Sequence, residues 1–366
     1  MDQYYLLGRS GLRVSRLSLG TMNFGTGGFH GPYGKTEDEA RPILRRYLDA
    51  GGNVLDTADF YTAGESETIL GNLLAEAGVR DRVVLTTKFT MSVGPGDPNA
   101  GGNGRKHMIR ALEASLRRLR TDYVDLFLLH VWDRVTPVEE VVRTFDDLTR
   151  AGKIRYAGLS DVPAWYAARA QTLAETGSLA PLVNLQLPYS LVARTIETEH
   201  VPVAQELGLG ITAWSPLAAG FLTGKYRATG DGMTGAGRLT GDGGAGYRWT
   251  ERDWAVLSTL EAVAGKLGVS MAQVAINWVA TQPGVASAIV GASSAEQLDS
   301  SLAALDVDLP DELRAELDAA GAVPPGYPYG MFTPEFQSWQ VSSGVRVGDK
   351  PPGYRPPVRN WVPERR

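Results

Sequence analysis

The sequence predicts an α/β protein of the (β/α)₈ TIM-barrel class. Short runs rich in apolar and β-branched residues alternate with longer segments of helical period along most of the chain, and this alternation is typical of parallel sheets. Polar side chains able to do chemistry stand at the ends of several runs, as they do at one mouth of a parallel barrel. About eight strands of this kind, each followed by a helix or a long connection, favour a closed barrel over an open sheet.

An N-terminal hairpin and eight strands account for the β-rich runs. Residues 4–7 and 12–14 flank the turn-like G-R-S-G and predict the hairpin. The predicted barrel strands are 17–22, 53–57, 83–88, 123–130, 154–160, 182–187, 210–215 and 286–291.

Helices are predicted between the strands. Thr36 stands three residues before Glu39, which is the spacing of a capping box, and Gly51 and Gly52 end the same helix. A helix ending near Leu119 carries apolar residues at three- and four-residue spacing, the pattern of one buried face. The remaining predicted helices are 36–50, 66–77, 137–151 and 163–176.

Two intervals are too long for simple connections. The glycine-rich stretch 216–250 after the seventh strand is predicted to be a lid or binding loop. The tail from residue 322 contains P-P-G-Y-P-Y-G-M-F, and proline at this density precludes a regular helix. We therefore expect one barrel domain over 1–321 and a Pro/aromatic extension over 322–366 whose aromatic rings pack on the barrel mouth. Disorder is the alternative for residues beyond about 345.

Composition excludes several classes of protein. The 366 residues are 43% hydrophobic and 21% charged, contain no cysteine, and carry a formal net charge of -5 without a basic cluster. These values argue against disulfides, thiolate catalysis and nucleic-acid binding. The four histidines are far apart in sequence, so we expect no metal site. Without an apolar run of roughly 18 residues or a signal peptide, the chain is expected to be cytoplasmic and not to enter a membrane.

Four residues at strand ends form a candidate catalytic site. Asp56 and Tyr61 follow the second strand, Lys88 ends the third, and His130 ends the fourth. A phenol is a weak acid with a pKa near about 10, and an ammonium beside it lowers that value. A carboxylate would in turn keep the buried ammonium charged. The alternative is a buried ion pair with a packed aromatic ring and a histidine that bonds a backbone carbonyl.

The motifs around these residues resemble the aldo-keto reductase family, from about Leu7 to about Tyr329. The resemblance lies in the following segments: L-G-R-S-G-L-R-V-S-R-L-S-L-G-T-M, L-D-T-A-D-F-Y, T-K-F, L-L-H, R-A-G-K-I-R-Y-A-G-L-S, the Q-x-x-Y of Gln186 and Tyr189, W-S-P-L-A-A-G-F-L-T-G-K-Y, and G-A-S-S-A-E-Q-L. It implies that Tyr61 is the general acid and base, that Lys88 and Asp56 tune it, and that His130 orients the substrate carbonyl.

The same resemblance implies a nicotinamide dinucleotide, NADP with NAD as the alternative, across the C-terminal mouth of the barrel. Trp214 would stack on the nicotinamide ring, and Lys225 with Arg238 would cover the pyrophosphate. The implied cofactor-binding residues are Thr21, Met22, Asp56, Ser160, Asp161, Gln186, Trp214, Ser215, Leu217, Gly220, Lys225, Arg238, Gly291, Ser293, Ser294, Gln297 and Ser301.

The chain departs from the family pattern at two places. Asp161 stands where Asn is usual, and a carboxylate accepts hydrogen bonds but cannot donate them. Ser293 and Ser294 stand where an Arg or Lys is common, and Ser301 where Asn is common. Hydroxyls bring no charge to a 2′-phosphate, so we expect NADPH to be preferred by only about one order of magnitude.

The resemblance implies hydride transfer between NAD(P)H and a small-molecule carbonyl or alcohol, which includes sugars and natural-product intermediates. Two alternatives stay open. One is a redox-neutral enzyme, such as an epimerase, with tightly bound NADP. The other is a nucleotide-sensing regulatory subunit of a membrane complex.

Overall fold

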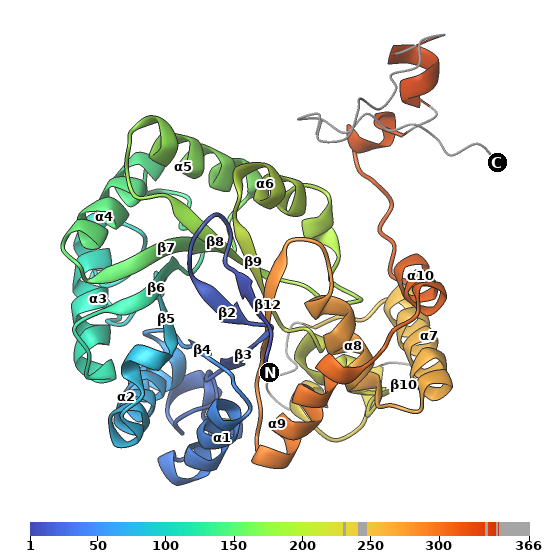
Figure 1. Ribbon diagram of the computed structural model, residues 1–366, viewed down its shortest axis with the longest axis horizontal. Coiled ribbons are helices and arrows are strands. Elements are labelled where there is room, and N and C mark those ends of the chain that lie inside the picture. Colours follow the sequence, from blue (N-terminus) through green and yellow to red (C-terminus); the bar gives the residue numbers. More distant parts are fainter. Residues whose placement is uncertain (230–231, 241–246, 334–335, 342, 344–366) are drawn as a thin grey trace. The chain divides into compact units, whose positions relative to one another are not determined.

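Eight parallel strands close into a barrel in the computed structural model, which describes residues 1–229, 232–240, 247–333, 336–341 and 343. The strands follow one another around the barrel in chain order, and the last pairs with the first (Figure 1). The predicted (β/α)₈ class is confirmed. The strands are β3 (Leu17–Gly20), β4 (Val54–Asp56), β5 (Val84–Phe89), β6 (Val124–Leu129), β7 (Ile154–Ser160), β8 (Leu182–Pro188), β9 (Gly210–Trp214) and β12 (Val285–Val290).

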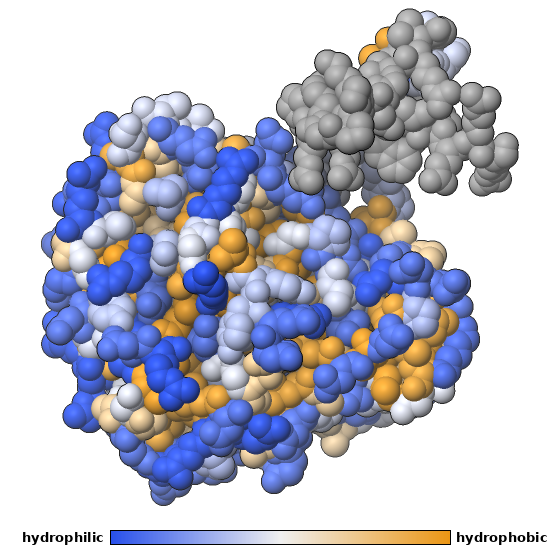
Figure 2. Space-filling view, in the orientation of Figure 1, coloured by the Kyte–Doolittle hydropathy of each residue, from blue (hydrophilic) through white to orange (hydrophobic). Residues whose placement is uncertain are grey.

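Helices surround the barrel. Thr36 accepts a hydrogen bond from the backbone of Glu39, and the Glu39 carboxylate bonds back, so the predicted capping box is present. Figure 2 shows hydrophilic residues along much of the outer rim, with hydrophobic residues between them. The helices are α1 (Glu37–Asp49), α2 (Glu65–Ala77), α3 (Arg105–Leu119), α4 (Val138–Arg150), α5 (Ala164–Thr176), α6 (His200–Leu207), α7 (Glu251–Leu267), α8 (Met271–Ala280), α9 (Ala295–Leu302) and α10 (Asp311–Ala320).

The N-terminal hairpin closes one end of the barrel. Strands β1 (Tyr4–Leu6) and β2 (Arg13–Ser15) pair antiparallel, as predicted. Leu7 and Val14 are buried in one apolar cluster with residues from the first halves of the strands, among them Val54 and Val84. Because this end is filled, the opposite end, where the strands terminate, is the one available for a site.

The interval after β9 contains more regular structure than the glycine-rich sequence indicates. Two short helical turns, η5 (Ala218–Thr223) and η6 (Arg238–Thr240), enclose a hairpin of β10 (Arg227–Thr229) and β11 (Gly232–Thr234). The predicted lid or binding loop over 216–250 therefore contains a short ribbon, in which the backbone groups of the two strands pair with each other. Its role as a lid stays a prediction. Residues 230–231 and 241–246 lie outside the described part.

The chain divides into two compact units, Met1–Gly321 and Ala322–Arg366. In the second unit, η9 (Tyr329–Met331) brings the ring of Tyr329 to 5.7 Å from that of Phe332. Packing of this unit on the barrel mouth stays a prediction, and residues 334–335, 342 and 344–366 lie outside the described part. In the described ranges no single helix is long and apolar enough to cross a membrane. Taken together, α7 and α8 have the length and composition of a membrane-spanning segment, but the pair is bent by 100°.

Candidate active site

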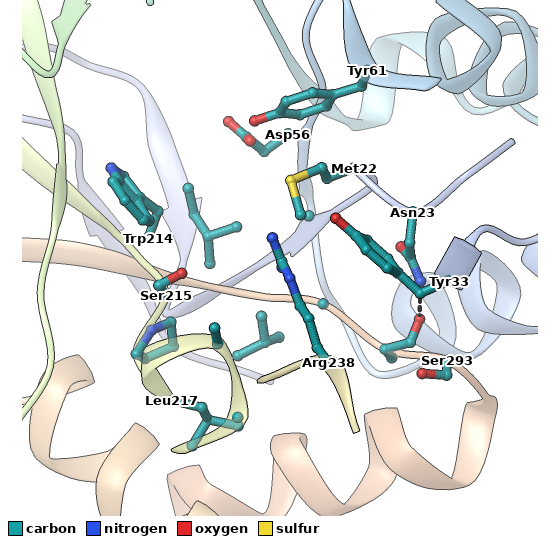
Figure 3. A pocket seen from close by; sticks show the side chains of 18 of the residues that line it. Met22, Asn23, Tyr33, Asp56, Tyr61, Trp214, Ser215, Leu217, Arg238 and Ser293 are labelled. Atoms are coloured by element: carbon teal, nitrogen blue, oxygen red, sulfur yellow. Dashed lines mark hydrogen bonds between the residues drawn. The ribbon is translucent and has the colours of Figure 1, made fainter. Parts of the chain in front are cut away.

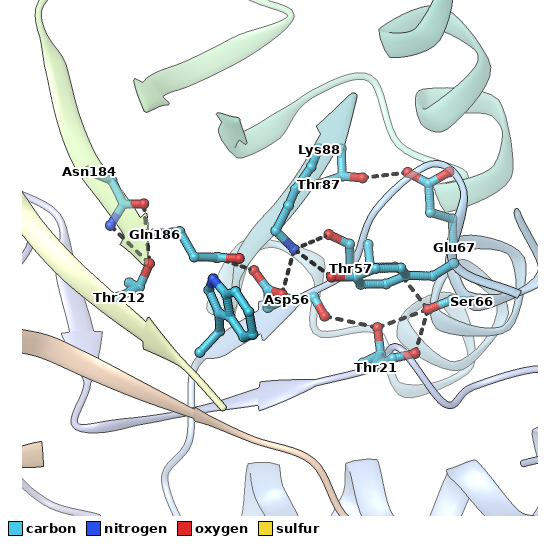
Figure 4. A network of polar contacts seen from close by, with 12 residues as sticks. Thr21, Asp56, Thr57, Ser66, Glu67, Thr87, Lys88, Asn184, Gln186 and Thr212 are labelled. Carbon is cyan, nitrogen blue, oxygen red and sulfur yellow. Dashed lines mark hydrogen bonds and ion pairs between the residues drawn. The ribbon is translucent and has the colours of Figure 1, made fainter. Parts of the chain in front are cut away.

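Lys88 is the centre of a buried polar cluster at the C-terminal ends of the strands. Its ammonium Nζ donates to Asp56 Oδ1 over 2.6 Å, to the Thr57 carbonyl over 2.8 Å and to the Tyr61 phenol oxygen over 3.3 Å (Figure 4). Strands β4 and β5 are paired neighbours, which brings the carboxylate and the ammonium together. The structure therefore joins three of the four predicted catalytic residues by hydrogen bonds.

Tyr61 is carried on a strained turn. It begins η2 (Tyr61–Gly64), in which Thr62 and Ala63 have left-handed φ values of 47° and 58°. Such values cost about 1–3 kcal/mol each for non-glycine residues, and surrounding contacts must hold them. Thr62 supplies such contacts, because its hydroxyl donates to the Phe24 carbonyl and accepts from the Ser66 amide. The turn aims the Tyr61 ring at His130, with the ring centroids 5.8 Å apart.

Burial and charge act in opposite directions on the pKa of Tyr61. Burial raises it, Lys88 lowers it, and the net shift is upward. For Lys88, burial alone would lower the pKa, but Asp56 and Tyr61 outweigh burial and raise it. Lys88 thus stays charged and Tyr61 stays a protonated phenol at neutral pH. The ammonium opposes the rise in the phenol pKa, as expected, without bringing it below its ordinary value.

A second layer of polar contacts supports the cluster. Gln186 on β8 donates from Nε2 to Asp56 Oδ2 over 2.7 Å, so both carboxylate oxygens are bonded. Thr21 donates from its hydroxyl to the Asp56 carbonyl and is fully buried. Its contact with the cofactor stays a prediction. Contact of Gln186 with a cofactor carboxamide stays a prediction.

A pocket of about 440 Å³ opens above the cluster (Figure 3). Most of the predicted site residues line it, and Thr21, Lys88, Ser294 and Ser301 do not. Lys88 lies beneath the pocket with no exposed surface. Those that line it are Met22, Asp56, Tyr61, His130, Ser160, Asp161, Gln186, Trp214, Ser215, Leu217, Gly220, Lys225, Arg238, Gly291, Ser293 and Gln297.

The two serines outside the pocket lining have local roles. Ser294 is the N-cap of α9, and its hydroxyl accepts from the Gln297 amide over 3.2 Å. Ser301 is buried, and its hydroxyl donates to the Gln297 carbonyl over 3.2 Å. Their contacts with a cofactor phosphate stay a prediction, while Ser293, next to the cap, lines the pocket.

Among the pocket residues that were not predicted are Phe60, Asn23 and Tyr33. Phe60 packs its ring 5.3 Å from His130, and Asn23 donates to the Ala292 carbonyl over 2.9 Å, which ties the loop after β3 to that after β12. Tyr33 reaches the pocket from the glycine-rich loop after β3. An aromatic residue in a loop that follows a barrel strand was the available signal for Tyr33. For Asn23 the available signal was its position, because it directly follows Met22, which was predicted to line the site.

The donor set of the pocket fits a dinucleotide phosphate. Arg238 extends its guanidinium into the pocket, 4.8 Å over the ring of Tyr33 (Figure 3), and its buried Nε has no hydrogen-bond partner among the described residues. Lys225 lines the same pocket, and no carboxylate in the described ranges pairs with either cation. Gly220 has a φ of 93°, and a Cβ there would lie 3.5 Å from the Lys225 side chain, in space next to the cation. Cations and glycine backbone together suit phosphate oxygens.

Asp161 and Trp214 both line the pocket and are bonded to each other. The indole Nε1 of Trp214 donates to Asp161 Oδ1 over 3.1 Å. Burial raises the pKa of Asp161 to about 6, although the Trp214 bond and Lys88 oppose the rise. No group of three or more His, Cys, Asp or Glu side chains in the described residues is arranged to hold a metal ion.

Comparison with known proteins agrees with this geometry. The model of the Aldo/keto reductase family matches residues 16–322. The chain is 37% identical to an uncharacterized oxidoreductase, YrpG, of Bacillus subtilis over 92% of this chain and 100% of the relative. It is 32% identical to norsolorinic acid reductase stcV of Emericella nidulans, over 93% and 90% of the two chains. It is also 38% identical to a probable voltage-gated potassium channel subunit beta of Oryza sativa, over 83% and 92%.

The family match spans the hydrogen-bonded cluster, the pocket above it and all eight barrel strands. The chain therefore belongs to the aldo/keto reductase family of oxidoreductases.

Proposed function

We propose that this protein transfers hydride between NADP(H) and a small-molecule carbonyl or alcohol, with Tyr61 as the general acid and base. One observation carries the proposal: Lys88 Nζ lies 2.6 Å from Asp56 Oδ1 and 3.3 Å from the Tyr61 oxygen, beneath a pocket that the phenol lines. A phenol so placed can give a proton to an oxygen above it or take one from it.

Each residue of the cluster has a distinct role in this proposal. Tyr61 donates its O–H proton to the substrate oxygen during reduction and recovers it during oxidation. Lys88 stabilises the phenolate that is left behind, since its ammonium is held charged by Asp56. His130, 5.8 Å from Tyr61 between ring centroids, orients the substrate oxygen. The nicotinamide, when bound, supplies or accepts the hydride.

The cofactor would be held by the remaining pocket residues. Arg238 and Lys225 offer cations to the phosphates, and Trp214 offers a flat aromatic face to the nicotinamide. Ser293 brings a hydroxyl without charge, which supports NADP(H) over NAD(H) by a modest margin. We propose the cytoplasm as the compartment, where NADPH is available.

The substrate would enter beside Phe60 and His130, whose rings lie 5.3 Å apart at the pocket. An aromatic wall suits a substrate with apolar surface. The relative named norsolorinic acid reductase supports a natural-product carbonyl, and sugars remain within the proposed range.

A nucleotide-sensing regulatory subunit is the second candidate function. The relative named as a potassium channel subunit beta favours it. The buried cluster would then bind and report the cofactor while turnover stays slow. A redox-neutral reaction with bound NADP is compatible with the same cluster and is distinguished by the fate of the cofactor.

Tyr61→Phe tests the proposal. With NADPH and a panel of aldehydes and ketones, we expect kcat to fall by at least about 10²-fold while the dissociation constant for NADPH stays within about twofold. Tyr123→Phe is the matched control, because that phenol donates to Asp81 outside the pocket. Wild-type kcat in Tyr61→Phe would remove the phenol from the mechanism.

Two results with the wild type would favour the other functions. Tight NADPH binding with negligible turnover of every carbonyl and alcohol would favour the sensor. NADP that co-purifies and is not consumed while a substrate epimerises would favour the redox-neutral enzyme.

A further inference from the structure

Asp161 brings to the pocket a negative charge that its structural contacts do not need. Its Oδ1 accepts one hydrogen bond, from Trp214 Nε1 over 3.1 Å. Its backbone φ of 44° lies in the left-handed region, which Asp and Asn both tolerate. An Asn would keep this conformation and accept the same bond with its amide oxygen. Any effect that Asp161 has on the pocket and that an Asn would lack must therefore come from the charge of its carboxylate.

The charged groups of the catalytic cluster near Asp161 balance one another, whereas the cations Lys225 and Arg238 belong to the part of the pocket that would hold the phosphates. Lys88 is paired with Asp56 over 2.6 Å, and the Tyr61 phenol is neutral because burial raises its pKa. Within the described ranges Asp161 forms no ion pair, and its bond to Trp214 is to a neutral donor. It is nevertheless close enough to act electrostatically on both Lys88 and Tyr61. When ionised, Asp161 is the excess charge beside the proton donor.

This charge acts differently on the two forms of the cofactor, and the inference rests on the proposed function. Tyr61 protonates the oxygen next to the carbon that receives hydride, so the hydride donor must lie close to Tyr61 in any productive pose. Hydride carries away two electrons and one proton, which turns a neutral reduced nicotinamide into a ring with one positive charge. A nearby carboxylate attracts the oxidised ring and has little effect on the reduced one.

We propose that Asp161 makes the protein bind NADP⁺ more tightly than NADPH and so lowers the reduction potential of the bound couple. A tenfold difference in affinity corresponds to about 30 mV for a two-electron couple. The bound reduced cofactor is then the stronger hydride donor. Asp161 thereby favours carbonyl reduction and slows the release of NADP⁺.

The preference depends on pH with a defined sign. Burial raises the pKa of Asp161 to about 6, so the carboxylate is ionised above that pH and neutral below it. The titratable groups of the catalytic cluster that share the pocket with it are Asp56, Tyr61 and His130, with Lys88 bonded to the first two. Tyr33, Lys225 and Arg238 line the same pocket. The 2′-phosphate, like other phosphate monoesters, titrates near about pH 6 as well. Because it is common to both cofactor forms, its titration cancels in the ratio of their dissociation constants. The comparison with Asp161→Asn then separates Asp161 from the other groups of the pocket.

Calorimetric titration of the full-length protein tests the proposal without turnover. NADP⁺ and NADPH are titrated separately into wild type, Asp161→Asn and the control Asp308→Asn, at about pH 5.5 and about pH 8. Asp308 is an exposed carboxylate outside the pocket, so its variant loses the same charge elsewhere. We expect the ratio Kd(NADPH)/Kd(NADP⁺) at the higher pH to be at least about tenfold smaller in Asp161→Asn, and unchanged in Asp308→Asn. In the wild type and in Asp308→Asn, but not in Asp161→Asn, this ratio should fall on acidification.

Each result decides the matter. Equal ratios in wild type and Asp161→Asn, with both nucleotides bound, would overturn this inference and leave the proposed function standing. No binding of either nucleotide to the wild type would overturn both. If Asp161→Asn does not fold, Trp214→Phe serves, since it keeps a ring but removes the donor that lowers the Asp161 pKa. The pH at which the ratio changes should then move upward, and an unmoved transition would contradict the role of Asp161.

Discussion

Gln186 and Asp56 lie 130 residues apart in sequence and are joined by a 2.7 Å hydrogen bond across the barrel. The amide donates to one carboxylate oxygen while Lys88 donates to the other. The carboxylate that keeps the ammonium charged is thus fixed from two strands, β5 and β8. Asp56 can rotate away from Lys88 only by breaking the bond to Gln186.

Gln186→Leu should therefore weaken both the fold and the reaction. The change leaves a buried carboxylate oxygen without its donor, which costs about 1–3 kcal/mol in the free energy of unfolding. Gln186→Glu keeps the shape but sets a second acid against Asp56, and two adjacent carboxyls cannot both ionise readily. The free energy of unfolding of the Gln186→Glu variant, measured by urea unfolding, should therefore fall as the pH rises from about 5 to about 8. A pH-independent loss in Gln186→Glu would mean that the two groups do not interact.

Lys88→Met should destabilise the protein and abolish activity, and a second substitution should separate the two effects. Removing the ammonium leaves Asp56 buried without its cation, which costs about 3–5 kcal/mol. Adding Asp56→Asn removes the stranded charge, so most of the stability should return in urea unfolding. Turnover should not return, because no cation then stabilises the Tyr61 phenolate. Recovery of activity in the double variant would show that the ammonium is dispensable.

The barrel could be predicted from the sequence because its strands are periodic and apolar. Strand β7 was predicted at its observed bounds, and the capping box of α1 was found because its two residues are three positions apart. A local pattern of this kind predicts the observed element when the tertiary contacts favour the same structure. The strand ends then brought Asp56, Lys88 and Tyr61 together as expected.

The contacts that support the site could not be predicted in the same way. The bond from Gln186 to Asp56 depends on barrel closure, which no local pattern encodes. Thr62 adopts a left-handed φ of 47° that its type disfavours, so the turn that aims Tyr61 is fixed by tertiary bonds. The upward shift in the pKa of Tyr61 follows from burial, which the spacing of charged residues does not reveal.

Asp59 should make stability fall as pH rises. Its side chain is buried, and a hydrogen bond from the Phe60 backbone and the attraction of Arg118 only partly offset the effect of that burial. Burial, reinforced by Glu67, raises its pKa from 3.8 to about 8. Between these values the folded protein holds a proton that the unfolded chain releases, so stability is lost from about pH 4 to about pH 8. The slope contributed by one proton is at most about 1.4 kcal/mol per pH unit.

Asp59→Asn should flatten this dependence, since an amide does not titrate. Urea unfolding at several pH values between about 5 and about 8 measures the slope. Asp122→Asn, an exposed carboxylate, is the matched control and should keep the wild-type slope. An unchanged slope in Asp59→Asn would mean that Asp59 is ionised in the folded protein.

Truncation after Ala322 tests the expected role of the aromatic extension. If that segment narrows the substrate mouth, its removal should change KM for bulky carbonyls more than for small ones, because only large substrates reach it. Truncation after residue 343 removes the last residues but keeps the rings of Tyr329 and Phe332, and it should behave as the full chain does. Equal changes across substrate sizes would show that the extension does not contribute to the pocket.

Ser293→Arg should widen the preference for NADPH over NADH. Ser293 lines the pocket, whereas the hydroxyl of Ser294 is engaged in capping α9, so we expect a cation placed at position 293 to reach a bound phosphate. A charge-assisted bond contributes about 1.5–3 kcal/mol against about 0.5–1.5 for a neutral hydroxyl. The wild type should therefore prefer NADPH about tenfold, and the variant about tenfold more than that.

Ser258→Arg adds the same charge on the exposed side of α7 and should leave the preference unchanged. Titration of both nucleotides into all three proteins measures the ratios. A wild-type preference of about a thousandfold would assign the 2′-phosphate to another cation, and Arg238→Ala would then remove that preference.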